Sequence, residues 1–166
     1  HVLSRTQKHA FDFVILGSNG STYERSGTRN EDYYAFGKYL YAVCDAEVVK
    51  VITGVRDNKP GEMNPSQAFG NCVVLKTEND EYIVYAHFEE GTLKLKEGDL
   101  VKKGQYLGNC GNSGNSSEPH LHFHIQDGPD LYSAGGVKCY FEAIKVNGTI
   151  EKDYSPAKND RVSRID

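Results

Sequence analysis

The chain has 166 residues and a formal net charge of −4, with acidic and basic residues interspersed. This length fits one domain with a buried core, and the charges form no basic stripe of the kind that binds nucleic acid. No apolar run approaches the ~20 residues of a transmembrane helix. Because the sequence begins at His1 without a methionine or an apolar leader, we expect a processed chain whose targeting segment has been removed.

The first predicted strand, Ala10 to Leu16, is apolar except for one acid, Asp12. A charge in an apolar strand is costly unless it is paired or bound to a cation. A turn cap or an edge position facing water would also accommodate this carboxylate. The residues that follow, Gly17 to Asn30, are rich in glycine and serine and predict a surface loop.

Four more strands are predicted in the middle of the chain, where runs rich in valine, isoleucine and tyrosine alternate with turn signals. They span Tyr39 to Cys44, Ala46 to Ile52, Asn71 to Thr77 and Glu81 to Phe88. Residues 56–69 are polar and broken by prolines, which indicates a long loop at the rim of a site. Farther on, Gly98-Asp99 and Lys103-Gly104 predict tight turns around a short strand.

A glycine-rich loop, Gly108 to Glu118, runs directly into a strand that carries half of the six histidines of the chain. Glycines let the backbone of such a loop approach a ligand closely. In the strand, His120, His122 and His124 project from one face, and the alternate residues Leu121, Phe123 and Ile125 read as core. His120 and His122 are ~6.6 Å apart at Cα and can reach one ion, whereas His120 and His124 are ~13 Å apart. The alternative is a solvated, histidine-rich edge strand.

The C-terminal part offers one more strand candidate, Cys139 to Val146, and then a polar tail. We therefore divide the chain into a domain of residues 1–150 and a tail of residues 151–166. The four cysteines lack the short paired spacing of a zinc–cysteine site, and one disulfide of open pairing is possible.

Three pieces of sequence occur together: an acid in the first strand, Tyr85-Ala86-His87, and the loop Gly111-Asn-Ser-Gly114 leading into Glu118-Pro119-His120-Leu-His122-Phe. The combination resembles the lysostaphin-like (LytM, M23) zinc metallopeptidases, which cut peptide cross-links in bacterial cell walls. The resemblance covers roughly Ala10 to Gln126. It implies an all-β fold, mainly antiparallel: a partly open, barrel-like sheet of the lysostaphin type (duplicated hybrid motif) with long rim loops.

In that family an aspartate, an upstream histidine and the second histidine of a His-x-His pair bind zinc. Carried over residue by residue, the resemblance implies Asp12 and His122 as zinc ligands and His87 and His120 as the catalytic pair. His124 stands where Glu or Gln is commoner in the family, and it can line the cleft without touching the ion.

The third ligand is where this chain departs from the pattern. The usual position, four residues before the aspartate, is Lys8 here. His9 is three residues before Asp12, an offset that places it on the opposite face unless a bulge intervenes. His1 lies farther away but can reach the site from a preceding strand or loop. We favour His1 over His9.

Two histidines and one carboxylate leave an open zinc position for water, as in hydrolytic sites. The resemblance implies that the ion makes this water more acidic and polarises the scissile carbonyl. His120 or His87 then takes the water proton, and both imidazoles stabilise the oxyanion and protonate the leaving amine. Spacing alone also allows a site of His87, His120 and His122, which leaves Asp12 unexplained.

The leading hypothesis is a monomeric zinc endopeptidase that acts on peptidoglycan peptides outside the cytoplasm, with no nucleic acid partner and no transmembrane segment. A second hypothesis, motivated by Lys8, is a catalytically silent module of the same fold that binds the cell wall or regulates another hydrolase. A third is a lipoyl- or biotinyl-type carrier barrel, which needs a modifiable lysine at an exposed hairpin tip and makes the histidine constellation accidental.

Overall fold

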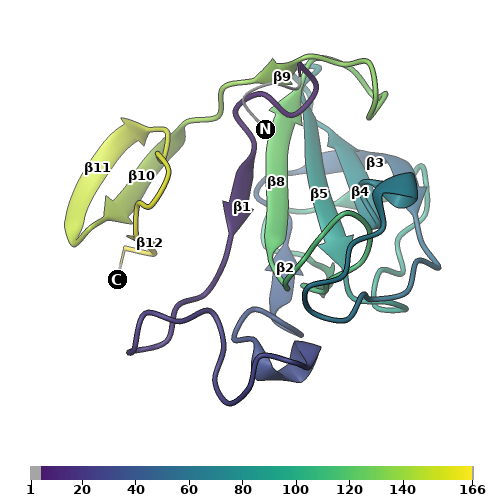
Figure 1. The fold of residues 1–166 in the computed structure, drawn as a ribbon. Helices are drawn as coiled ribbons and strands as arrows, with labels where there is room; N and C mark the ends of the chain where they lie inside the picture. The colour runs from purple at the N-terminus through teal and green to yellow at the C-terminus, as the bar shows by residue number, and fades with distance from the viewer. Residues whose placement is uncertain (1–4, 166) are drawn as a thin grey trace.

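The computed structural model describes residues 5–165, which fold almost entirely into antiparallel strands (Figure 1). This confirms the fold class predicted from the sequence. Within this range no helix is long and apolar enough to cross a membrane. The strands are β1 (Phe11–Phe13), β2 (Tyr39–Tyr41), β3 (Ala46–Ile52), β4 (Asn71–Lys76), β5 (Tyr82–Phe88), β6 (Leu100–Val101), β7 (Tyr106–Asn109), β8 (Leu121–Gln126), β9 (Gly136–Val137), β10 (Phe141–Val146), β11 (Thr149–Tyr154) and β12 (Val162–Ser163), and the short 3₁₀ helices are η1 (Asn30–Asp32) and η2 (Pro65–Gln67).

One seven-stranded sheet dominates the molecule, with the order β1-β8-β5-β4-β3-β6 and with β9 paired to the end of β8. All of its pairings are antiparallel. A separate pair, β2 and β7, lies below this sheet in Figure 1. Because β8 lies between β1 and β5, the histidine strand is an interior strand, and the hypothesis of a solvated edge strand is wrong.

The central strands β4 and β5 are apolar on both faces because each face of the sheet is covered. On one face the larger core contains Val73, Leu75 and Tyr85. On the other face a smaller cluster contains Val74 and Val84 together with residues of the rim loops. Strands buried on both faces read as continuous apolar runs rather than as alternating ones, which is how the segment Asn71–Lys76 reads.

In β8 the alternation predicted from the sequence is confirmed. Leu121, Phe123 and Ile125 pack against the larger core. The opposite face carries His122 and His124, residues that are 1% and 0% exposed. Polar side chains buried this deeply need hydrogen-bond partners. The partners of these histidines on this second face of β8 therefore bear on function.

The first strand is shorter than the predicted Ala10 to Leu16 and ends at Phe13. Its register against β8 places Asp12 directly opposite His122. Phe11 and Phe13 stack on each other and pack against Phe141 at the start of β10. The aromatic contacts anchor the strand, so the position of its single acid is defined.

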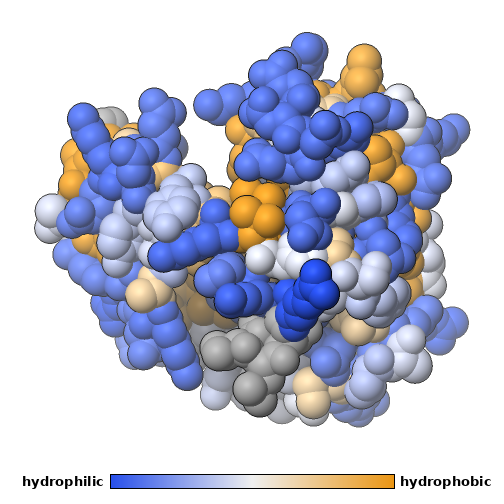
Figure 2. Space-filling model, turned by 90° about the horizontal axis from the view of Figure 1, so that it is seen from above, coloured by the Kyte–Doolittle hydropathy of each residue, from blue (hydrophilic) through white to orange (hydrophobic). Residues whose placement is uncertain are grey.

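The C-terminal residues form a sheet of their own, β11-β10-β12, which lies beyond β1 in Figure 1. Seen from above, it stands to one side of a largely hydrophilic surface (Figure 2). A polar, frayed tail from Glu151 was expected, but β11 pairs with β10 through Tyr154. The hairpin turn is Asn147-Gly148, both with positive φ, and Asn-Gly is a strong signal for a two-residue hairpin that our sequence analysis overlooked.

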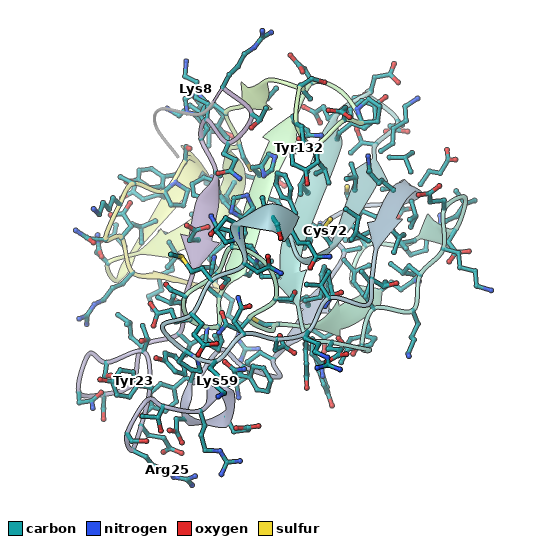
Figure 3. The ribbon with its side chains drawn as sticks, turned by 45° about the vertical axis from the view of Figure 1, so that its right-hand side comes forward. Lys8, Tyr23, Arg25, Lys59, Cys72 and Tyr132 are labelled. Carbon is teal, nitrogen blue, oxygen red and sulfur yellow. The ribbon has the colours of Figure 1, made fainter. Side chains whose placement is uncertain are left out.

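All four cysteines are free thiols. Cys72 lies in the middle of the sheet (Figure 3), and burial raises its pKa to about 12. Burial likewise raises the pKa of Cys110 to about 12. A thiol with a pKa this high is inert at neutral pH, so these two cysteines read as small core residues.

Candidate metal and catalytic site

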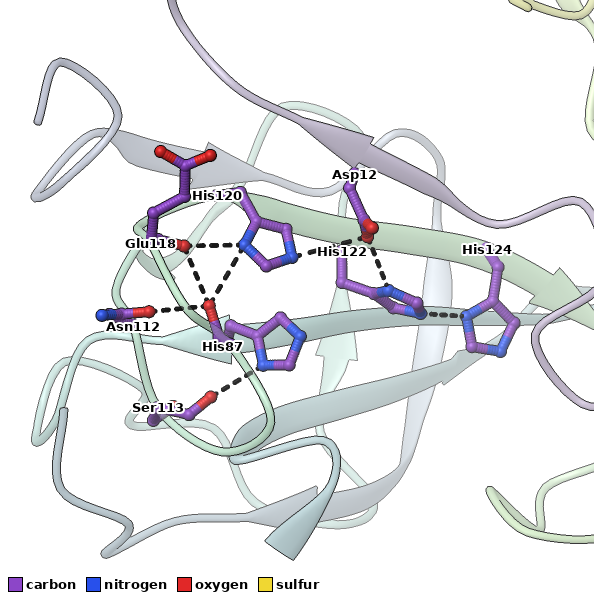
Figure 4. A network of polar contacts seen from close by, with 9 residues as sticks. Asp12, His87, Asn112, Ser113, Glu118, His120, His122 and His124 are labelled. Atoms are coloured by element: carbon purple, nitrogen blue, oxygen red, sulfur yellow. Dashed lines mark hydrogen bonds and ion pairs between the residues drawn. The ribbon is translucent and has the colours of Figure 1, made fainter. Parts of the chain in front are cut away.

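Side chains from three separate segments meet on the second face of β8 (Figure 4). They are Asp12 of β1, His87 at the end of β5, and His120 and His122 at the start of the histidine strand. The Asp12 Oδ1 atom lies 2.9 Å from His122 Nδ1 and 3.4 Å from His120 Nε2. The structure therefore brings together four of the five site residues predicted from the sequence. The fifth, His1, lies outside the described residues.

Antiparallel pairing explains why Asp12 and His122 meet. Residues directly opposite each other in an antiparallel pair send their side chains to the same face, with Cβ atoms ~4.5–5.5 Å apart. The Asp12–His122 pair is such a position. A shift of the β1 register by one residue would turn the carboxylate to the opposite face of the sheet.

His87 enters the site through a β-bulge. In the pairing of β4 with β5, Asn71 is opposite Phe88 and Val73 is opposite Tyr85, so Ala86 and His87 together oppose Cys72. Strict alternation would point His87 to the side of Tyr85. Its φ of 66° breaks the alternation, and its ring centroid lies 4.8 Å from that of His120. A non-glycine residue in this conformation is uncommon, and such strain clusters at functional sites.

Backbone carbonyls determine which nitrogen of the His87 and His120 rings carries the proton. His87 Nδ1 lies 2.7 Å from the Ser113 carbonyl oxygen, and His120 Nδ1 lies 2.8 Å from that of Glu118. A carbonyl oxygen only accepts, so each Nδ1 donates. In the neutral rings, each Nε2 therefore keeps a lone pair.

The surroundings shift the pKa values of His87 and His120 in opposite directions. Burial, followed by the neighbouring His120 and His122, lowers the pKa of His87 to about 3. Burial also acts to lower the pKa of His120, but the hydrogen bond and charge of Asp12, with help from Glu118, outweigh it and raise the pKa above its usual value. Near neutral pH, His87 is thus a neutral imidazole, and His120 is the better proton acceptor of the two.

The glycine-rich loop after β7 holds these rings by its backbone. Its Asn112 and Ser113 side chains are fully buried. The Asp57 carboxylate accepts a hydrogen bond from the Asn112 N–H at 2.6 Å. The Asn58 side-chain amide donates to the carbonyls of Gly114 and Ser116 at 2.6 and 2.9 Å. Asp57 and Asn58 are structural residues of the site that the sequence analysis placed only in a rim loop.

Gly114 is where this loop touches the loop before β4. A Cβ atom on Gly114 would overlap the backbone of Gly70, and its φ is +82°. We expect Gly114→Ala to lower the free energy of unfolding by ~2–5 kcal/mol, from backbone strain and overpacking together. Denaturant unfolding measures this loss. Gly104→Ala is the matched control, because Gly104 has the same φ of +82° and open space around it. Equal losses in the two variants would contradict the close approach.

A narrow cleft of about 200 Å³ opens over the histidines. It is lined by Asp12, His87, His120 and His122 together with Gln7, Met63, Ala68, Phe69, Asn115, Ser116 and Ser117. Residues 17–30 support one side, where the Thr22 hydroxyl donates a 2.7 Å hydrogen bond to the Glu118 carboxylate. Tyr23 and Arg25 of this loop lie at its outer end (Figure 3).

Lys8, at the usual position of the third ligand, and its neighbour His9 do not line the cleft. His9 is exposed in a turn with φ 66° and does not line the cleft. Lys8 is also exposed. Of the two histidine candidates, His9 is thus the less suitable, and the assignment of His1 stays a prediction.

The donor set suits a zinc ion. Two zinc ligands at the usual ~2.0–2.1 Å from the ion lie roughly 3.3 Å apart in a tetrahedral site. The Asp12 oxygen lies 2.9 Å from the His122 nitrogen and 3.4 Å from the His120 nitrogen, close to that spacing. Ligand atoms of His87, His120 and His122 also lie within 4.8 Å of one another. Among the described residues, the Asp12–His122 pair and the group of three histidines are thus both available to a metal ion, and His1 of the first set lies outside those residues.

Comparison with known sequences gives one family match. The sequence model of peptidase family M23 matches residues 31–133, which contain the three site histidines and the glycine-rich loop. Asp12 lies before the matched segment.

Three curated proteins are similar over shorter segments. Cell division protein DipM of Caulobacter vibrioides is 33% identical over 83 residues, 48% of this chain and 13% of that protein. Endolysin 2638A of Staphylococcus phage 2638A is 33% identical over 93 residues, 55% of this chain and 18% of that protein. Peptidoglycan DD-endopeptidase ShyA of Vibrio cholerae is 36% identical over 56 residues, 34% of this chain and 13% of that protein. This chain thus spans less than a fifth of each relative.

Two solved structures align with most of this chain at lower identity. The catalytic domain of the prophage-encoded M23 protein EnpA from Enterococcus faecalis aligns with 75% of this chain and 92% of that domain, at 22% identity and a TM-score of 0.48. The solution structure of lysostaphin aligns with 76% of this chain and 39% of that chain, at 22% identity and a TM-score of 0.46.

Proposed function

Because the chain belongs to peptidase family M23, we propose that it is a zinc metalloendopeptidase that hydrolyses peptide bonds of bacterial peptidoglycan outside the cytoplasm. The observation that carries the proposal is the pairing of Asp12 with His122 beside two further imidazoles in one cleft. A buried imidazole and a carboxylate on paired strands form half of a hydrolytic zinc site.

Asp12 and His122 would hold the ion through Oδ1 and Nδ1, and His1 would complete the set. A zinc ion in such a site acts as a Lewis acid that polarises a carbonyl group and makes a water molecule more acidic. The same Asp12 oxygen lies 3.4 Å from His120 Nε2, so its charge would stabilise the proton that this ring takes up. These two roles would explain why an otherwise apolar strand contains an acid, although a charge there is costly.

His120 and His87 would move protons. The Nε2 atoms of both rings carry the lone pairs, because each Nδ1 donates to a backbone carbonyl. His120 is the proposed general base, since its raised pKa lets it take a proton from water near neutral pH. His87, neutral and buried, is proposed to hydrogen-bond the developing oxyanion and the leaving amine.

The cleft supports a peptide substrate with small side chains next to the cleaved bond. Its volume of about 200 Å³ is below the ~300–1,000 Å³ of typical small-molecule sites. Asn115, Ser116 and Ser117 line it with polar groups suited to an extended backbone. The relatives include a protein named a peptidoglycan DD-endopeptidase, which supports the cell wall as the source of this peptide.

A second candidate is a catalytically silent module of the same fold that binds the cell wall or regulates another hydrolase. The observation that favours it is Lys8, which stands exposed at the position usually taken by the third ligand. A site with two protein ligands would hold zinc weakly.

One experiment separates the two candidates. We expect elemental analysis of the purified chain to find one zinc per molecule, and the protein to release peptides from purified peptidoglycan. Removal of the metal with a chelator should abolish release, and added zinc should restore it. A protein that binds peptidoglycan without zinc and without turnover would support the silent module and reject the peptidase.

A further inference from the structure

Behind His122, away from the cleft, a buried row of hydrogen bonds continues along β8 through His124 and Gln126. We propose that His124 and Gln126 are positioning residues that hold the His122 ring in the tautomer whose Nδ1 can bind a metal. This inference rests on the proposed zinc site and extends it to two residues that do not touch the ion.

The row begins at Gln126, whose orientation is determined by the backbone. Its side-chain nitrogen donates to the carbonyl oxygens of Gly128 at 2.7 Å and Asp130 at 3.4 Å. Carbonyl oxygens only accept, so the NH₂ group must face them. The side-chain oxygen of Gln126 therefore points the other way, toward His124.

The orientation of Gln126 determines which nitrogen of His124 carries the proton. Its Nε2 lies 3.0 Å from the Gln126 oxygen, which only accepts, so Nε2 carries the proton and donates. In the neutral ring, Nδ1 of His124 then has a lone pair. This atom lies 2.9 Å from His122 Nε2 and accepts a hydrogen bond from it.

This hydrogen bond also determines the state of the other nitrogen of His122, Nδ1. Because His122 Nε2 carries the proton, Nδ1 of the neutral ring has a lone pair, and this lone pair faces the Asp12 carboxylate oxygen at 2.9 Å. Two acceptors at this distance repel each other unless a cation, either a proton or a metal ion, lies between them. The row therefore prepares a metal-binding nitrogen opposite a metal-binding oxygen.

Packing and burial strengthen this effect. His124 and Gln126 are both 0% exposed, so a ring in the wrong tautomer would leave a buried polar atom without its partner, which is unfavourable. Phe69 packs against the rings of His122 and His124, with centroids 6.1 and 6.3 Å away. The strand geometry makes the row possible, because residues 122, 124 and 126 share one face.

The test measures zinc affinity of the full chain by competition with a chromophoric chelator. His124→Leu removes the acceptor, and we expect it to weaken zinc binding by ~10–100-fold, the usual effect of losing a group that supports a metal ligand. His124→Gln offers a side-chain oxygen in place of Nδ1 and should restore most of the affinity. Val74→Ala, a buried substitution on the same face outside the row, controls for loss of stability and should bind zinc like the wild type.

A second readout is the tautomer of His122 in the metal-free protein, observed by long-range ¹H–¹⁵N NMR. We expect a proton on Nε2 in the wild type and a mixture of tautomers in His124→Leu. A neutral wild-type ring with its proton on Nδ1, or equal zinc affinity in wild type and His124→Leu, would overturn the inference. A wild type with the expected tautomer and no zinc binding would reject the proposed function and leave the tautomer assignment standing.

Discussion

His122→Ala should release the zinc ion and reduce peptidoglycan cleavage to the level of the chelator-treated wild type. The side chain supplies the buried nitrogen opposite Asp12, 2.9 Å from its carboxylate oxygen. Because a ligand itself is lost, the decrease in zinc affinity should exceed the ~10–100-fold expected for a supporting residue. Elemental analysis and a cleavage assay on the same preparation measure both effects.

His9→Ala is the matched control for this prediction, because it removes an exposed imidazole that does not line the cleft. It should retain zinc and activity, whereas His1→Ala should lose zinc if His1 is the third ligand. A His122→Ala variant with stoichiometric zinc and full activity would contradict the site. Zinc loss in His9→Ala alone would transfer the third-ligand assignment to His9.

His120→Ala and His87→Ala are expected to keep zinc but to lower kcat by ~10²–10⁴-fold, the usual contribution of a positioned acid or base. The rings lie beside the Asp12–His122 pair, with centroids 4.8 Å apart. Both would serve the reaction through Nε2 rather than hold the metal. Zinc content and single-turnover rates measured together separate binding from chemistry.

The same variants test the competing three-histidine site. If His87, His120 and His122 bind the ion together, each substitution should release zinc, and Asp12→Ala should leave the metal in place. If Asp12 is a ligand, Asp12→Ala should lose zinc, while His120→Ala and His87→Ala retain it. Unchanged kcat in both histidine variants would reject their catalytic assignment.

Much of the fold was predictable because its signals are local. The strands β3, β4, β5 and β8 follow runs of apolar and β-branched residues, and the glycine-rich loop was visible in composition. The C-terminal sheet was predicted only in part, since β11 is polar and exposed along most of its length. Strand β11 is held by its pairing with β10 and by the Asn147-Gly148 turn. That turn was the sequence signal for β11.

Candidate site residues could be named from the sequence, but not how they are held. Asp57 and Asn58 bind the backbone of a loop more than 50 residues away, and no short-range pattern marks such contacts. The support of His122 by His124 and Gln126 depends on burial of their strand face, because in water the same imidazoles would exchange tautomers freely.

The order of residues along the chain is sufficient to predict β-structure, a strand with three histidines on one face, and an acid that needs a partner, because side-chain alternation and polarity are properties of short segments. The meeting of Asp12 with His122 required the register of β1 on β8, and the turn of His87 into the cleft required the bulge opposite Cys72. Both depend on hydrogen bonds between strands distant in sequence. For that reason, only the folded molecule determines which of the candidate groups share one site.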